Sequence, residues 1–156
     1  MIAQHMDDQY IPSFVKRLNS VCALHVESVR EGGVLLQNRV YVCSSICELL
    51  LQRSMLVGGK ECSVDDYNPS IDSFFTSVSS FANKMDVLAI VLTGIGADGA
   101  TGMRKIVDSG GKAIVESSKS AVVYGMPLRA KELTPQAKEL SLDEIIDQIL
   151  EFGRYV

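Results

Sequence analysis

The sequence lacks long apolar runs, a surplus of basic residues and a leader-like N-terminus. Its longest apolar run, Val87 to Leu92, is far shorter than the ~20 residues that a membrane-spanning helix needs. The N-terminal residues show neither the basic region nor the apolar core of a signal peptide. Fifteen basic and nineteen acidic residues give a net charge of −4, without a basic stripe that could follow a phosphate backbone. We therefore expect a cytoplasmic protein that neither inserts into a membrane nor binds nucleic acid.

Metal-binding and disulfide patterns are also scarce. The four cysteines (Cys22, Cys43, Cys47 and Cys62) form no CxxC pair, and only two histidines could complete a metal site. Cys43-x3-Cys47 lacks the second pair of ligands that a zinc site requires. We expect small, buried, apolar cysteines in a reducing compartment, and neither a metal nor a cofactor.

The remaining composition is that of a globular protein. Of the 156 residues, 47% are hydrophobic and 22% are charged, and there are no repeats or low-complexity tracts. This length favours one domain over residues 1–156. Its apolar content is sufficient for a core that needs no disulfide or metal.

The first half of the chain predicts a helix followed by short strands. The helix begins at Ile11, with Pro12 near its first position, and an alternating strand pattern follows over 24–29. Up to about Val64 the apolar segments are short and separated by Gly-Gly turns; they cover 34–36, 39–42, 49–51 and 54–57. We interpret this stretch as antiparallel hairpins added to a larger sheet.

The second half predicts a parallel α/β arrangement. An apolar helical stripe follows Ser70, and an apolar β-branched run over 86–92 indicates a strand buried on both faces. A glycine-rich turn, a helix and a second strand over 112–116 complete one βαβ unit. Ser141 and Glu144 have capping-box spacing. They open a last helix whose inward residues we predict to be Leu142, Ile145, Ile146, Ile149 and Leu150.

The glycine-rich turn allows two interpretations. Gly94-x-Gly96-x-x-Gly99 fits the dinucleotide fingerprint, and Glu116 follows at the end of the next strand, where a ribose-binding acid could lie. Against a nucleotide-binding module, only one βαβ unit is evident, and Asp98 would bring a carboxylate close to the pyrophosphate. A plain strand-to-helix turn also explains the glycines.

Asp98 has a second possible role, because a carboxylate in a rigid turn can orient a histidine. His25 lies in an alternating strand pattern, which favours a structural or exposed side chain. His5 follows residues that resemble the end of a strand, so it too would lie at a carboxyl end. A His5–Asp98 pair is the acid–base hypothesis that these residues support.

Five segments follow one another in the order found in a known family. They are Gln4–Met6 with Ser13-Phe14 and Arg17-Leu18, Val40–Val42, Pro69–Asp72, Thr93–Gly102 and Ser120–Pro127. Together they resemble the catalytic domain of the chemotaxis protein-glutamate methylesterase, CheB. The resemblance implies a three-layer α/β fold with a mostly parallel, doubly wound sheet and an antiparallel hairpin addition. It also implies hydrolysis of glutamate γ-methyl esters, and deamidation of glutamines, on cytoplasmic helices of chemoreceptors by a Ser-His-Asp triad without metal or cofactor.

The resemblance assigns roles to individual residues. His5 matches the general base and Asp98 the carboxylate that holds it. Ile95 stands where the family has a methionine whose backbone N–H serves the oxyanion hole, a role that tolerates the change of side chain. The residues expected near the site without a chemical role are Gly94, Gly96, Gly99, Tyr124 and Met126.

Two departures from the family pattern limit what this chain is expected to do. The family's nucleophilic serine lies in a Gly-x-Ser-Thr-Gly-Gly turn, and no such turn occurs in these residues; the usual receiver domain is also missing. A Cys43–Glu48 segment replaces the Pro-Gly-Gly turn of the family. We therefore expect a truncated domain, inactive alone, that self-associates through exposed strand edges. A non-catalytic receptor-binding remnant is the remaining alternative.

Overall fold

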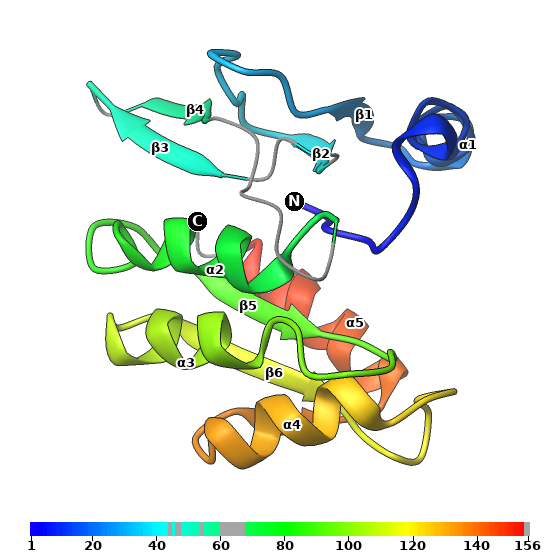
Figure 1. Cartoon of the computed structure of the whole chain (residues 1–156), viewed down its shortest axis with the longest axis vertical. Helices are drawn as coiled ribbons and strands as arrows, with labels where there is room; N and C mark the ends of the chain where they lie inside the picture. The colour runs from blue at the N-terminus through cyan, green and yellow to red at the C-terminus, as the bar shows by residue number, and fades with distance from the viewer. Residues whose placement is uncertain (44, 46–47, 54, 60–67, 155–156) are drawn as a thin grey trace. The chain divides into compact units, whose positions relative to one another are not determined.

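The computed structural model describes residues 1–156 except 44, 46–47, 54, 60–67 and 155–156 (Figure 1). The chain divides into two compact units, Met1–Val78 and Ser79–Val156. Among the described residues, no helix is long and apolar enough to cross a membrane. Because the chain divides into two units, the interpretation of residues 1–156 as one domain stays a prediction.

The first unit combines one parallel and one antiparallel strand pair. Its elements are η1 (Asp8–Tyr10), α1 (Ile11–Val21), β1 (His25–Ser28), β2 (Arg39–Val42), β3 (Leu49–Gln52), β4 (Met55–Gly58) and α2 (Ile71–Ser79). β1 and β2 are parallel, and Ile2 forms an isolated parallel bridge with Val42. β3 and β4 form an antiparallel hairpin.

The prediction of hairpins is confirmed for β3 and β4 and is wrong for β2. β2 runs parallel to β1. Residues 34–36 do lie antiparallel to β4, with an isolated bridge from Val34 to Val57 and the Leu35 N–H donating to the Leu56 carbonyl at 2.8 Å. The parallel pairing has a physical reason: it brings Val26 of β1 and Val42 of β2 into one buried cluster with Ile11 of α1. Burial of such side chains stabilises a fold by ~1.5–3 kcal/mol each.

Cys43 follows β2 in this core and is fully buried, as predicted, whereas Cys22 is exposed at the end of α1, which contradicts the prediction. Cys47 and Cys62 lie outside the described residues. Burial raises the pKa of the Cys43 thiol to about 12, because the apolar surroundings disfavour the thiolate.

The raised pKa of Cys43 predicts a loss of stability in alkali. Above pH 9, the thiol's ordinary pKa, the unfolded chain loses this proton, while the folded chain keeps it up to about pH 12. The free energy of unfolding should therefore fall by roughly 1 kcal/mol per pH unit as the pH rises through this window. Urea unfolding of Cys43→Ala should lack this component, and Cys22→Ala should retain it. An equal slope in wild type and Cys43→Ala would contradict the prediction.

The second unit is a parallel sheet with helices on both faces. Its elements are β5 (Leu88–Val91), α3 (Ala100–Asp108), β6 (Lys112–Glu116), α4 (Gly125–Leu133), β7 (Lys138–Leu140) and α5 (Leu142–Phe152). The strand order is β5-β6-β7, all parallel. α3 and α4 pack together on one face and α5 lies on the other, so this unit has the three predicted layers (Figure 1).

The predicted βαβ unit, β5–α3–β6, is confirmed, whereas α4 and β7 were not predicted. The sequence of α4 carries Gly125 and Pro127, which usually mark turns. Proline is tolerated there because it lies in the first helical turn, where its missing N–H has no intrahelical partner. β7 is short and polar, with Lys138 and Glu139 exposed.

α5 begins at the predicted capping box, where the Ser141 N–H donates to Glu144 at 2.7 Å. The prediction of five inward residues is right for Ile145 and wrong for the other four. Only Ile145 is buried; the exposed side chains are Leu142, Ile146, Ile149 and Leu150 at 44–60% exposure. The strand residues opposite α5 are Leu88, Lys112, Ile114 and Lys138, and an open cavity lies between them and the helix, so α5 does not bury its whole apolar stripe there.

Candidate functional site

The glycine-rich turn joins the carboxyl end of β5 to the N-terminus of α3. Gly94 makes a close approach there, since a Cβ atom on it would lie 2.2 Å from the Met126 sulfur. Gly99 precedes α3 with φ +90°, a left-handed conformation that glycine adopts without strain. The turn therefore requires glycine at position 99 for its shape, whether or not it contacts a ligand, whereas a side chain at position 94 would require the flexible Met126 side chain to move.

Asp98 lies in this turn and is only 5% exposed. It stands two residues before α3, where the positive end of the helix dipole favours a negative charge. His5 lies in the first unit, between the Ile2 bridge and η1, with its side chain half-buried. The pairing of His5 with Asp98 stays a prediction. His25 is exposed at the start of β1.

Ile95 is a strongly exposed residue of the turn. Its side chain is 78% exposed, and within the described residues its backbone N–H makes no hydrogen bond. A free N–H that is held by a rigid turn is the type of donor that stabilises an oxyanion. The geometry is therefore compatible with the predicted role, which the backbone and not the isoleucine side chain would perform.

The segment of Tyr124 and Met126 lies beside the turn. Gly94 forms a parallel bridge with Tyr124, and the Met126 N–H donates to the Gly94 carbonyl at 2.8 Å. The Tyr124 hydroxyl donates to Glu139 at 2.8 Å, a partner that sequence analysis missed. Partial burial raises the pKa of Tyr124, and the hydrogen bond to Glu139 raises it further. Its hydroxyl is thus directed to β7.

Glu116 ends β6, as predicted, but sequence analysis missed its hydrogen-bond partners. Its carboxylate is 3% exposed and accepts hydrogen bonds from the Thr93 N–H at 2.8 Å and the Ser120 hydroxyl at 2.9 Å. A ribose-binding acid must present its oxygens to a ligand, whereas these two oxygens are already bound within the protein. This arrangement counts against the nucleotide interpretation. The sequence signal was an acidic residue closing a buried apolar strand, which requires a partner.

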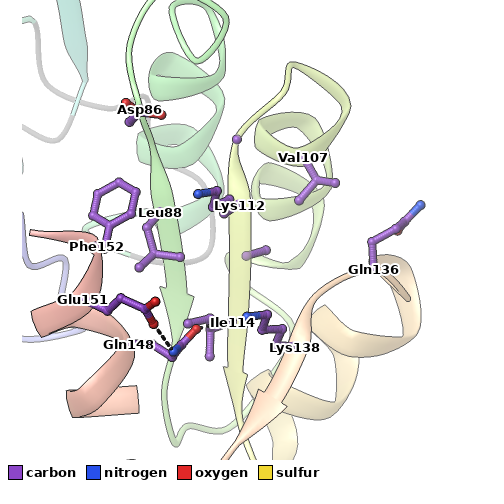
Figure 2. A pocket seen from close by; sticks show the side chains of 12 residues that line it. Asp86, Leu88, Val107, Lys112, Ile114, Gln136, Lys138, Gln148, Glu151 and Phe152 are labelled. Atoms are coloured by element: carbon purple, nitrogen blue, oxygen red, sulfur yellow. Dashed lines mark hydrogen bonds between the residues drawn. The ribbon is translucent and has the colours of Figure 1, made fainter. Parts of the chain in front are cut away.

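A cavity of about 550 Å³ lies elsewhere in the second unit (Figure 2). It is formed near the amino ends of the strands, by Lys112 and Lys138 of the sheet together with Gln148, Glu151 and Phe152 of α5. Ligand sites of open α/β sheets lie beyond the carboxyl ends of their strands. The cavity is therefore separate from the turn that holds Asp98. Over the described ranges, no group of three or more His, Cys, Asp or Glu side chains could hold a metal ion.

Comparisons with known proteins agree on one family. The profile described as CheB methylesterase matches residues 1–149. Two relatives are named protein-glutamate methylesterase/protein-glutamine glutaminase. The protein of Treponema pallidum is 32% identical over 99% of this chain and 39% of its own length. That of Pseudoalteromonas translucida is 35% identical over 93% of this chain and 38% of its own length.

The fold comparison gives the same result. The crystal structure of the Thermotoga maritima CheB methylesterase catalytic domain matches with a TM-score of 0.85 at 26% identity. The match covers 96% of this chain and 81% of that domain. The chain spans less than half the length of the curated relatives that it matches. These agreements support the methylesterase interpretation and not the nucleotide alternative, and the chain belongs to the CheB methylesterase family.

Proposed function

We propose that this chain forms the acid–base part of a protein-glutamate methylesterase. The reaction converts a glutamate γ-methyl ester and water into a carboxylate and methanol. In this assignment His5 is the general base and Asp98 holds its imidazole, while the nucleophilic serine comes from a segment outside these 156 residues. The chain alone is inactive, because its residues contain no Gly-x-Ser-x-Gly turn.

Each proposed residue performs one step. Asp98 accepts a hydrogen bond from Nδ1–H of His5, which leaves Nε2 free to take the serine proton. The serine oxygen attacks the ester carbonyl, and the Ile95 N–H stabilises the oxyanion that forms. His5 then returns the proton to the departing methoxide, and water repeats the sequence on the acyl-enzyme.

The burial of Asp98 in the glycine turn is the observation that carries the proposal. A sheltered carboxylate that follows a β-strand has the rigidity that an orienting group needs, and the same turn presents the N–H of Ile95. The family match covers both His5 and Asp98. We further propose that the substrates are cytoplasmic helices of chemoreceptors and that the protein is cytoplasmic.

Labelling with a fluorophosphonate probe tests the proposed function. The chain alone should show no labelled serine, whereas the chain joined to a family Gly-x-Ser-Thr-Gly-Gly segment should be labelled at that serine. His5→Ala should abolish the labelling, because the serine then lacks its base. His25→Ala is the matched control and should leave it unchanged. A joined protein that stays unlabelled would favour the non-catalytic remnant.

We also propose that the isolated chain self-associates. In the described part of the second unit, β5 pairs with β6 alone, and its Leu-Ala-Ile-Val sequence carries no charge or proline to protect an edge. α5 presents four exposed apolar side chains, Leu142, Ile146, Ile149 and Leu150. A second copy can cover both features at once, by strand pairing and by helix packing.

Light scattering at micromolar concentration should therefore detect a dimer or a larger species. Introducing charge on the apolar side of α5, with Ile146→Lys and Leu150→Lys together, should yield a monomer because the charged side chains resist burial. Asp147→Lys changes the charge of the same helix without removing an apolar side chain and should leave the association intact. A monomeric wild-type chain would overturn this part of the proposal.

A further inference from the structure

The carboxylate of Glu116 is buried at the end of β6, and no cationic partner for it lies among the described residues. Glu116 is 3% exposed. Burying an ionised carboxylate is costly unless hydrogen bonds replace its hydration. Here two donors do so: the Thr93 N–H at 2.8 Å and the Ser120 hydroxyl at 2.9 Å. Both donors are neutral groups, and the Glu116 carboxylate accepts one hydrogen bond from each.

The bond to Thr93 continues the sheet by one step. The backbone register of β5 and β6 ends at the pair Val91 and Val115, and the next inward N–H on the β5 side belongs to Thr93. A side-chain oxygen of Glu116 accepts that N–H in place of a backbone carbonyl. Thr93 is thus fixed at the point where the chain leaves the strand and enters the turn.

The other groups of Thr93 and Gly94 are fixed from the opposite side. The Val123 N–H donates to the Thr93 hydroxyl at 2.8 Å, and the Gly94 N–H donates to the Val123 carbonyl at 2.9 Å. Glu116 therefore supplies the sheet side of a two-sided clamp. Asp98 and Ile95 lie on the segment that leaves this clamp.

Ser120 connects the clamp to α5. Its hydroxyl donates to Glu116 and accepts the N–H of Leu142, the first residue of α5, at 3.0 Å. One chain of hydrogen bonds thus joins the end of β5, the end of β6 and the start of α5. Such a connected network restrains each member more than an isolated bond would.

We propose that Glu116 is a positioning residue, whose carboxylate, braced by Ser120, holds Thr93 and through it the turn that presents Asp98 and the Ile95 N–H. This inference rests on the proposed function, because that proposal pairs Asp98 with His5. What the role requires is reach and acceptor capacity. Glutamine supplies both, because its amide oxygen can accept the Thr93 N–H while its NH₂ donates to Ser120. Aspartate keeps the charge but is one methylene too short.

Glu116→Gln and Glu116→Asp therefore form a matched pair for the test. In the 156-residue chain, amide exchange at Thr93 should be about tenfold faster in Glu116→Asp, because its hydrogen bond is lost, and unchanged in Glu116→Gln. The second readout is the His5 tautomer, from the ¹⁵N shifts of its ring. Wild type and Glu116→Gln should hold the Nδ1–H form, and Glu116→Asp should lose it towards the Nε2–H form.

Asp98→Asn separates this inference from the proposed function. It should remove the Nδ1–H tautomer of His5; an unchanged tautomer would overturn the proposed function and the positioning role with it. If Asp98→Asn acts as expected but Glu116→Asp leaves the tautomer as in wild type, only the positioning role is overturned. If Glu116→Gln lost the Nδ1–H tautomer and Glu116→Asp kept it, the negative charge at position 116 would be what matters. That result would also overturn the positioning role.

Discussion

Asp98→Asn is expected to lower kcat for glutamate methyl-ester hydrolysis by ~10⁴ in the chain joined to a family Gly-x-Ser-Thr-Gly-Gly segment. The asparagine amide keeps the size of the side chain but offers an N–H towards the imidazole. His5 then adopts the tautomer that cannot take the serine proton. KM should change little, because Asp98 is buried and in the proposed assignment binds the imidazole and not the substrate. Methanol release from a methylated receptor measures both constants.

The two histidines provide the control for this experiment. His5→Ala should remove nearly all activity, since no other base is assigned to the serine. His25→Ala should be indistinguishable from wild type, because His25 is exposed at the start of β1. If His5→Ala kept more than about a tenth of the activity, the assignment of the base would be wrong.

Much of the second unit could be predicted because its signals are local. An apolar β-branched run, a glycine turn and an amphipathic helix each reveal their own conformation, and β5, α3 and β6 follow that order. Strand direction is not local. Whether β2 pairs parallel or antiparallel depends on which partner covers Val42, and that partner lies in β1. The same limit applies to α5, whose apolar spacing predicts a buried face but not the size of the surface beneath it.

The candidate site was predictable only in part. The family resemblance named Asp98 and the turn, and the structure places Tyr124 and Met126 beside Gly94. The partner of each buried polar group was not predictable. Glu116 looked available for a ribose, yet its oxygens are used by Thr93 and Ser120. The Thr93 pairing joins residues 23 positions apart, so no local pattern encodes it; the Ser120 pairing spans four positions, but Ser120 lies in a turn whose path the sequence did not reveal.

Gly125→Ala is expected to destabilise the second unit by ~1–3 kcal/mol, as overpacking does elsewhere. A Cβ atom on Gly125 would lie 2.8 Å from the carbonyl oxygen of Gly94. That oxygen belongs to the backbone and accepts the Met126 N–H, so it cannot move aside without breaking the contact between the two segments. The movement would also displace Ile95 and reduce kcat through the oxyanion donor.

Gly153→Ala is the matched substitution for this prediction. Gly153 has φ −67°, and a Cβ atom on it would meet its nearest neighbour, the Ile149 carbonyl oxygen, at an ordinary 3.5 Å. Alanine should therefore be neutral or stabilise by ~0.4–1 kcal/mol, because it restricts the unfolded chain. Urea unfolding of both variants measures the difference. Equal midpoints for Gly125→Ala and Gly153→Ala would show that the backbone at Gly94 moves without a loss of stability. The claim that this turn is rigid would then be wrong.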